Sequence, residues 1–541
     1  MTRTSGLLRR PAAALPIALL LVLWQACASV PRRETASRRS PLVVVLVVDQ
    51  MRAQYLDDYG DRFTGGLKRL MNEGAWFRRA AYPYLNTITC AGHSTIGTGA
   101  LPYRHGMILN AWWDRATARV VSCTADPSAK AIGYMGRPTG GDSAASLLVP
   151  TLAQQLREKT GGRSVAISLK ARSAITLVGN NTNAATWFDD RAGWTTSSAV
   201  TDHPVEWVRQ FIAANPVEAD RGKTWERVQP LAAYRGEDDG KGERAPTGWT
   251  KTFPHVVGEP AAQFLAQWQR SPFADDYLGR FAAQAIDTLD LGRGEGTDFI
   301  SVGFSSLDLL GHQYGPRSHE VQDLLFRLDR TIGTLLDHLD ARLGRDGYVL
   351  AISADHGVAD VPEQTGAGRE PAADILAAID KALLPFFGPG KYAVHAAYTD
   401  IYLGPGIFER LQRSPNASAA VLDAIRALPG IAHAFRRDEI DSEAVRNGAD
   451  PVKRAAALSY YGPRSGDLIV IPQRNWLLST AATTHGTLYP YDQRVPVIFF
   501  GAGVTPGVHD TPATPADIAP TLAGLAGASF SSTDGTALLR R

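Results

Sequence analysis

The sequence lacks any marked excess of charge of one sign. Lys and Arg total 56 against 54 Asp and Glu, which gives a formal net charge of +2. Residues 1–28 contain three Arg and no acidic residue, so their removal would lower the net charge to −1. A chain this close to neutral has no basic surface of the kind that binds nucleic acid. We therefore expect no nucleic acid as an obligate partner.

Long hydrophobic runs are also missing. The apolar segment near the N-terminus, Ile17–Trp24, is shorter than the ~20 residues that a membrane-spanning helix needs. It follows three arginines and precedes the small-residue segment Ala26-Cys27-Ala28, which is the layout of an export signal. We therefore predict an export signal at residues 1–28 and a mature chain without a transmembrane segment.

Two processing routes remain open for this signal. Cleavage after Ala28 would release a periplasmic or secreted protein, because the small-residue rule is met there. Cleavage before Cys27 would give a lipid-anchored protein in the cell envelope, although Trp24 and Gln25 match the lipobox of bacterial lipoproteins poorly. Residues 29–40, rich in Arg, Ser and Pro, are predicted to form a flexible leader.

Cysteine is scarce, with three residues in the whole chain, of which Cys90 and Cys123 lie outside the signal. In an oxidising compartment these two could pair and close a loop. They could equally be two buried free thiols, because the sequence does not give their separation. Both alternatives stay open at this point.

What the sequence does contain is an alternation of strands and helices. The run Val43–Val48 is typical of a buried strand. Further predicted strands are 164–169, 299–304, 348–353, 467–471 and 495–500, and predicted helices are 318–343 and 372–384. This pattern indicates an α/β fold with a mainly parallel central sheet, and no internal repeat is present.

Two segments interrupt the alternation. The first, near 187–272, is rich in Trp and turn-forming residues, and we predict a cap-like insertion over the site. The second insertion is predicted near 388–468. Because 541 residues can form one large domain with insertions, we expect residues 41–541 to be a single catalytic domain.

Side chains that can bind metals follow several predicted strands. Asp49 ends the first strand, and Asp355 with His356 follows the strand at 348–353. After the strand at 299–304, a helical turn would place Asp308 and His312 on one face at positions i and i+4. Carboxylate and imidazole ligands without thiolates suit a catalytic zinc site better than a structural one. Taken alone, Asp355-His356 could also be a capping Asp beside a packing His.

A nucleophile is predicted at Thr89. The segment 86–99 is rich in hydroxyls and small residues, as a strand-to-helix turn with an exposed nucleophile requires. We interpret His93 and His105 in and after this segment as buried structural histidines within hydrogen-bonded loops.

The ordered set of these motifs resembles the alkaline phosphatase superfamily. The motifs are Asp49, Thr-Cys-Ala-Gly-His at 89–93, Asp308 with His312, Asp355-His356 and Thr484-His485-Gly486. Within that superfamily the chain most resembles the secreted bacterial phosphate-irrepressible alkaline phosphatases with a threonine nucleophile, which are relatives of the nucleotide pyrophosphatase/phosphodiesterases. The resemblance covers nearly the whole mature chain and implies a three-layer αβα fold with cap-like insertions.

The same resemblance implies two Zn²⁺ ions as cofactors. The first would be held by Asp308, His312 and His485, and the second by Asp49, Asp355, His356 and Thr89 Oγ. Two ions ~4 Å apart can activate the nucleophile and stabilise the leaving oxygen. A phosphothreonine would form on Thr89 and then be hydrolysed in a second in-line displacement.

Lys170 and Arg172 favour phosphate monoesters over diesters. They end the strand at 164–169, and a doubly charged terminal phosphate suits two cations better than a diester does. The resemblance implies the same two contacts, together with Asn110 and the backbone N–H of Cys90. A solvated basic pair at a strand end is the structural alternative. We therefore predict an alkaline phosphatase that acts on small-molecule phosphate monoesters. We also expect the enzyme to be a monomer.

Other functions are disfavoured by particular residues. A phosphodiesterase or nucleotide pyrophosphatase using the same metal site is the main alternative. A sulfatase would need Cys-x-Pro-x-Arg, which is absent at 89–93, and a phosphoglycerate mutase would use Ser and be cytosolic. A non-enzymatic metal- or phosphate-binding protein would not need Thr89.

Overall fold

A ten-stranded sheet forms the centre of the computed structural model, which describes residues 41–531 and 534–540. Its strand order is β18-β2-β17-β12-β1-β11-β6-β7-β8-β5. The five central strands run parallel to one another. They are β12 (Tyr348–Ser353), β1 (Leu42–Val48), β11 (Phe299–Phe304), β6 (Ser164–Ser168) and β7 (Ala184–Asp189). The predicted α/β fold with a mainly parallel sheet is therefore confirmed.

The edges of this sheet are mixed in direction. On one side β17 pairs antiparallel with β12, and on the other β8 pairs antiparallel with β7. The remaining edge pairs are β2 with β17, β18 with β2 and β5 with β8. The bounds of these strands are Val497–Gly501 (β17), Ala75–Phe77 (β2), Gly507–His509 (β18), Gly193–Ser197 (β8) and Ala131–Gly133 (β5).

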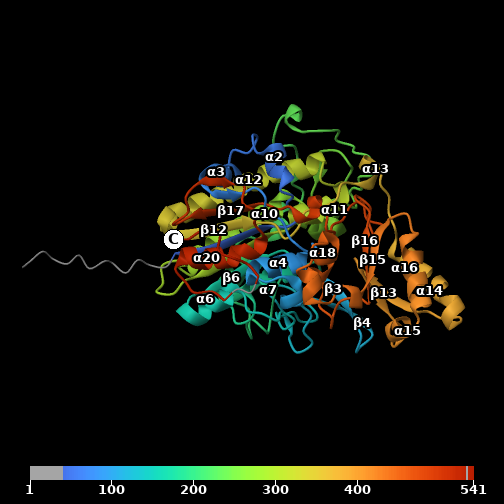
Figure 1. Cartoon of the computed structure of the whole chain (residues 1–541). Helices are drawn as coiled ribbons and strands as arrows, with labels where there is room; N and C mark the ends of the chain where they lie inside the picture. The colour runs from blue at the N-terminus through green and yellow to red at the C-terminus, as the bar shows by residue number, and fades with distance from the viewer. Residues whose placement is uncertain (1–40, 532–533, 541) are drawn as a thin grey trace, which may run out of the picture. The chain divides into compact units, whose positions relative to one another are not determined.

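Both faces of the sheet are buried, as the uninterrupted run of β1 predicts. Val44, Leu46 and Val48 belong to one hydrophobic core, and Val43, Val45 and Val47 belong to another. Helices cover each face, so the architecture has three layers (Figure 1). One side carries α3 (Gly66–Glu73), α10 (Pro272–Thr288) and α12 (His319–Leu343), and the other carries α4 (Thr89–Thr98), α6 (Leu152–Thr160), α7 (Ala171–Val178) and α20 (Ile518–Ala526).

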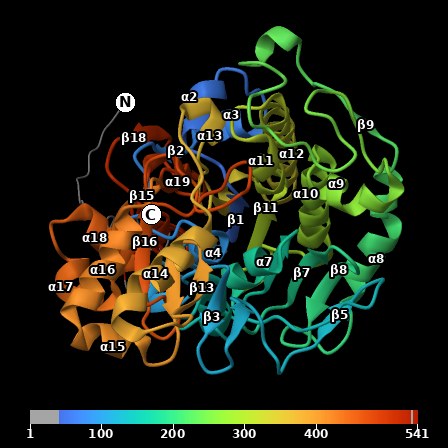
Figure 2. The same ribbon diagram turned by 90° about the vertical axis from the view of Figure 1, so that its right-hand side faces the viewer.

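A second, antiparallel sheet lies within the later part of the chain. Its order is β13-β14-β16-β15, and it has its own hydrophobic core with α14 (Ala372–Phe387) and α16 (Pro415–Arg426), which Figure 2 shows in orange. The strands are Ala393–Ala397 (β13), Asp400–Leu403 (β14), Ile431–Arg436 (β15) and Leu468–Pro472 (β16). The strand predicted at 467–471 therefore belongs to this sheet and not to the parallel one.

The Trp-rich segment near 187–272 contributes heavily to the core. Its first residues form β7 and β8, and Trp225 and Trp268 are fully buried. Trp225 Nε1 donates to Asp323 on α12 at 2.6 Å. The β7–β8 turn and Gln269 line a cavity beside Lys170.

The described residues belong to one compact unit. The predicted signal at 1–28, the leader at 29–40 and the possible anchor at Cys27 lie outside the described residues. Among the described residues, we find no helix that is both long and apolar enough to span a membrane.

Candidate active site

The carboxyl ends of the parallel strands bring the predicted residues together. Asp49 follows β1, Asp355 and His356 follow β12, and Lys170 follows β6. Asp308 lies on α11 (Ser306–Tyr314), the helix that begins after β11. Since these four strands are neighbours in one parallel sheet, their carboxyl ends meet at one edge, as expected for an open α/β sheet.

Asp308, His312 and His485 form one group able to hold a metal ion. The Nε2 atoms of His312 and His485 lie 3.2 Å and 3.7 Å from Asp308 Oδ1. The Nδ1 atoms lie 3.0 Å from Thr483 O and 2.9 Å from Thr87 O. A carbonyl can only accept, so each Nδ1 carries a hydrogen, which leaves Nε2 as the atom that can bind a metal when the ring is in its neutral form.

Asp49, Asp308 and His356 form a second such group. His356 Nε2 lies 3.4 Å from Asp49 Oδ1, 3.3 Å from Asp355 Oδ2 and 3.4 Å from Thr89 Oγ1. Asp308 thus stands between the two groups, whereas the sequence had assigned it to the first. Asp355 is adjacent, with Oδ1 accepting from the N–H groups of Gln50 and His356 at 3.1 Å each.

The proposed nucleophile begins helix α4. Thr89 is 1% exposed and follows Ile88, whose extended backbone leads into the helix. This places its hydroxyl at a helix N-terminus, where the helix dipole favours negative charge. The hydroxyl therefore faces the second metal-binding group from a position suited to a phosphate.

Lys170 makes contacts that the sequence did not predict. Its ammonium donates to Asp49 Oδ2 and Asp308 Oδ2, each at 2.5 Å. Burial would raise the pKa of the Asp308 carboxyl, but Lys170, His312 and His485 outweigh burial and hold that pKa well below its usual value. Burial and the neighbouring carboxylates raise the pKa of Asp49 well above its usual value.

The donor set fits divalent cations. Asp49, Asp308 and Asp355 are all at most 3% exposed, and in the described part of the chain one ammonium, that of Lys170, pairs with them directly. Asp49 Oδ1 and Asp355 Oδ2 are buried without a hydrogen-bond partner among the described residues. Histidine nitrogens lie 3.2–3.4 Å from these two oxygens, and a bound cation would compensate the remaining negative charge of the three buried carboxylates.

Asn110 contacts the residue after the proposed nucleophile, and Arg172 lies two residues after Lys170. Asn110 Oδ1 accepts from the backbone N–H of Cys90 at 2.9 Å, and its Nδ2 lies 3.4 Å from the hydroxyl of Tyr398. Arg172 is in the first turn of α7, and its Nε is buried without a partner in the described chain. The Cys90 N–H predicted to face phosphate is thus paired with Asn110 in this structure.

A disulfide joins Cys90 and Cys123, which decides the alternative that the sequence left open. The N–H of Cys123 also donates to the carbonyl of Asn110 at 2.9 Å. These two links attach the Asn110 loop to the first turn of α4.

His93 and His105 are both fully buried, as predicted for structural histidines. Neither lies in a loop as predicted, because His105 is the last residue of α5 (Pro102–His105) and His93 lies on α4, with Nδ1 at 3.0 Å from Thr89 O and 3.2 Å from Asp355 Oδ2. Burial lowers the pKa of His105 to about 3, and its Nδ1 accepts from the N–H of Met107.

Two residues near the site were missed by sequence reasoning. Gln50 has a left-handed backbone (φ 70°) and its side-chain amide donates to Asp308 Oδ1 at 2.7 Å. The position of Gln50 directly after Asp49 in the sequence is a signal that could have identified it as a residue of the site. Tyr398 comes from the β13–β14 hairpin, and no local sequence pattern connects it with the site.

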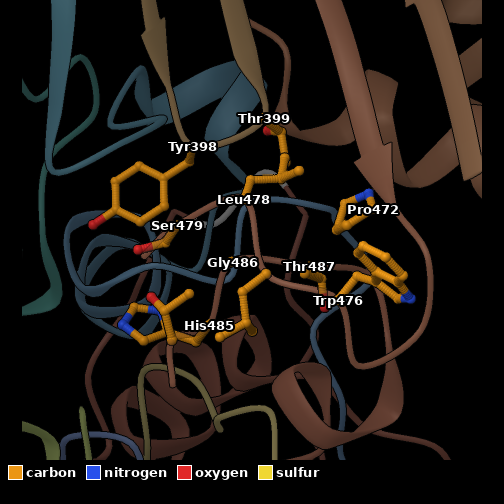
Figure 3. Close-up of a pocket in the computed structure, with 11 residues that line it drawn as sticks. Tyr398, Thr399, Pro472, Trp476, Leu478, Ser479, His485, Gly486 and Thr487 are labelled. Atoms are coloured by element: carbon orange, nitrogen blue, oxygen red, sulfur yellow. The ribbon is translucent and has the colours of Figure 1, made fainter. Parts of the chain in front are cut away.

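Two cavities adjoin the site. One, of about 490 Å³, includes Lys170 and Arg172 together with charged side chains of the β7–β8 turn. The other, of about 260 Å³, includes His485, Tyr398 and Trp476 (Figure 3). One cavity therefore begins at Lys170 and Arg172, and the other at His485.

Comparison with known proteins agrees with this geometry. The family model for type I phosphodiesterase / nucleotide pyrophosphatase matches residues 43–493. Alkaline phosphatase PafA of Elizabethkingia meningoseptica is 30% identical over 91% of this chain and 93% of its own, and alkaline phosphatase PhoV of Synechococcus elongatus is 32% identical over 90% of each. The crystal structure of PafA matches with a TM-score of 0.84, covering 92% of this chain and 98% of that one.

These matches extend over nearly the whole described chain and include every strand that delivers a site residue. The predicted family resemblance and the alkaline-phosphatase-like fold are confirmed. The chain thus belongs to the type I phosphodiesterase / nucleotide pyrophosphatase family, among relatives that are alkaline phosphatases.

Proposed function

We propose that this protein is an exported alkaline phosphatase that hydrolyses phosphate monoesters through a phosphothreonine intermediate at a two-zinc site. The observation that carries the proposal is the position of Thr89. Its hydroxyl lies at the start of a buried helix, 3.4 Å from His356 Nε2, beside carboxylates that have unpaired oxygens. The names of its relatives support the same activity.

We assign the metal ligands from the family resemblance, and the grouping of Asp308, His312 and His485 and of Asp49 and His356 supports this assignment. Asp308, His312 and His485 would hold one Zn²⁺, and Asp49, Asp355 and His356 would hold the other with Thr89 Oγ1. Asp308 lies close enough to both groups to orient the two sets. When bound, the ions supply Lewis acidity, which lowers the pKa of a coordinated hydroxyl and stabilises developing negative charge on oxygen.

The chain's own groups then perform two displacements. Thr89 Oγ1 gives up its proton and forms a bond to phosphorus, while the bond from phosphorus to the ester oxygen breaks and the alcohol leaves with a proton. Water then attacks phosphorus, the bond to Thr89 Oγ1 breaks, and phosphate departs. Both steps are in line, so Thr89 and the leaving oxygen lie on opposite sides of phosphorus.

Three polar groups would hold the phosphoryl oxygens. Arg172 provides a forked guanidinium, Asn110 provides its Nδ2, and Lys170 provides an ammonium once cations take over its carboxylates. These groups carry two positive charges, which match a monoester dianion better than a diester monoanion. This charge match is the reason for preferring a monoesterase.

A substrate comparison with metal analysis tests the proposal. We expect the purified mature protein to contain two zinc ions per chain and to show a higher kcat/KM for an aryl phosphate than for the matching aryl methyl phosphate. A clear preference for the methyl diester would instead support a phosphodiesterase using the same residues.

The signal layout of residues 1–28 supports export. The near-neutral net charge of the mature chain supports a small-molecule substrate and not nucleic acid. Identification of the N-terminus of the mature protein would distinguish cleavage after Ala28 from lipid attachment at Cys27.

A further inference from the structure

The aromatic cavity beside His485 has no role in the chemistry described above. It has a volume of about 260 Å³. Its lining includes Tyr398, Pro472, Trp476, Leu477 and Leu478. Figure 3 shows the Tyr398 ring and the Trp476 indole at opposite ends of the cavity, with His485 on the Tyr398 side. Thr399, Ser479, Thr484 and Thr487 also line the cavity, so its lining is mixed, and it is the presence of Trp476, Leu477 and Leu478 so close to a charged centre that requires an explanation.

We infer that this cavity receives the alcohol part of the substrate and selects aryl and other bulky apolar leaving groups. The inference rests on the proposed function and adds the class of leaving group to it. Three independent observations support it: the side of the site on which the cavity lies, the conformation of Tyr398, and the rigidity of the walls.

The cavity lies on the leaving-group side of the site. Thr89 faces His356, which belongs to the second metal-binding group. His485 belongs to the first group and lines the cavity. Because in-line displacement places the leaving oxygen opposite Thr89, that oxygen points toward the group containing His485. The remainder of the alcohol would then extend past His485 into the cavity.

Tyr398 connects the cavity with the phosphate-binding side. Its hydroxyl lies 3.4 Å from Asn110 Nδ2. Its backbone is left-handed (φ 53°), which is uncommon for an aromatic residue and persists where the surrounding structure fixes it. A Cβ added to Gly486 would lie 3.3 Å from Tyr398 Cδ1, so the ring packs directly against the segment carrying His485.

The opposite walls are held in place before any substrate binds. Arg369 donates to the carbonyls of Ala481 and Ala482 at 2.8 Å each and also pairs with Glu363. A Cβ added to Gly368 would lie 2.9 Å from the Trp476 ring, so this indole packs closely against backbone. Preformed apolar walls bind an apolar group without the cost of ordering them.

The cavity on the other side of the site has the opposite character. Its lining includes the charged side chains Arg137, Asp142, Asp189, Asp190 and Arg191. Burying an aryl group there would remove charges from water without compensation. An apolar leaving group therefore fits the cavity at Trp476 and not the one at Lys170.

The test compares Trp476→Ala with wild type on 2-naphthyl phosphate and glycerol 2-phosphate, using the zinc-loaded mature protein. Dividing each variant's kcat/KM by the wild-type value for the same substrate cancels the intrinsic reactivity of the leaving group. We expect the loss on naphthyl phosphate to exceed the loss on glycerol phosphate about tenfold, the usual size of an effect from one apolar pocket wall.

Two further variants keep the result interpretable. Leu478→Asn changes the same wall without removing an indole and should show the same differential loss. Trp207→Ala removes an equally half-buried indole on α8 (Glu206–Ala214), which packs on Phe281 far from the cavity, and should leave the substrate ratio unchanged.

Equal losses on both substrates in Trp476→Ala and Leu478→Asn would overturn the inference while leaving the proposed function intact. A wild-type protein inactive on both substrates would overturn the proposed function and, with it, this inference.

Discussion

Buried carboxylates occur in two regions of this protein, and they differ in what surrounds them. At the carboxyl end of the parallel sheet, Asp308 and Asp355 face Lys170 and several histidines, and the pKa of each is lowered despite burial. At the start of α12, Glu320 is fully buried against His255 of β10 (His255–Val256), 2.8 Å away. Burial raises the pKa of Glu320 to about 9.

The difference shows that neighbouring positive charge can outweigh burial, as it does for Asp308 and Asp355, whereas burial prevails for Glu320, and for Asp49 burial and the neighbouring carboxylates prevail over Lys170. His255 is itself neutral, because burial lowers its pKa to about 4, so it gives Glu320 no positive charge. Ionised carboxylates with free oxygens can hold cations, whereas a neutral carboxyl acts as a hydrogen-bonding core group. The carboxylates of the first region are therefore suited to binding cations, and Glu320 in the second region is suited to hydrogen bonding within the core.

The largest effect is expected when the nucleophile next to the first region is removed. Thr89→Ala should lower kcat/KM for phosphate monoesters by roughly 10³-fold or more, because no other group in the proposed mechanism forms the covalent bond. Steady-state kinetics on an aryl phosphate would measure it. Thr89→Ser is the matched control and should keep a trappable phosphoenzyme. Full activity in Thr89→Ala would refute the nucleophilic mechanism.

Removing the compensating cation should give the next largest effect. Lys170→Ala would leave Asp49 and Asp308 without their ammonium partner and the substrate phosphate without a donor. We expect kcat/KM for monoesters to fall by about 10²-fold, the usual cost of one such donor. The loss on an aryl methyl phosphate should be smaller, because that substrate carries one charge fewer. Equal losses on both substrates would show that Lys170 does not discriminate between them.

The smallest effect concerns the second region and appears as a pH dependence of stability. Folded protein keeps Glu320 protonated up to about pH 9, whereas in unfolded protein the carboxyl loses that proton near its ordinary pKa of 4.5. Between these values the folded state binds more protons, so stability falls as pH rises, by about 1 kcal/mol per pH unit. Glu320→Gln cannot ionise and should show a flatter dependence.

Urea unfolding at pH 7 and pH 9 would measure this difference, because above pH 7 His255 is neutral in both states. Glu206→Gln is the matched control, since Glu206 is exposed and should keep the wild-type slope. An unchanged slope in Glu320→Gln would mean that Glu320 is already ionised in the folded protein, and the contrast between the two regions would fail.

Much of the fold and the site could be predicted because the signals are local. The alternation of β1 between two cores follows from a strand period of two residues, and Asp49 ends that strand in sequence. Asp308 and His312 share a helix face because four residues make about one turn. Because parallel strands end at the same edge of a sheet, residues that directly follow these strands come close together.

Contacts between distant segments were not predictable in the same way. The strand at 468–472 has the composition of a core strand, but its partners β14 and β15 place it in the second sheet. The loose pattern of the Trp-rich segment, predicted to be a cap-like insertion, did not indicate that Trp225 and Trp268 are among the largest fully buried side chains. Composition does not reveal which neighbour a strand or an indole will have.

The sequence by itself determined which groups are available at this site: the Thr89 hydroxyl that we propose as the nucleophile, oxygen and nitrogen atoms able to bind metals without thiolates, and basic residues after β6. Only the tertiary structure decided that Lys170 lies between Asp49 and Asp308, that Asp308 stands between both metal-binding groups, and that Tyr398 and Trp476 border the site. The physical reason is that a residue's type and its place in a strand or helix are local properties. Charge compensation and cavity shape depend on side chains that are hundreds of residues apart in the chain.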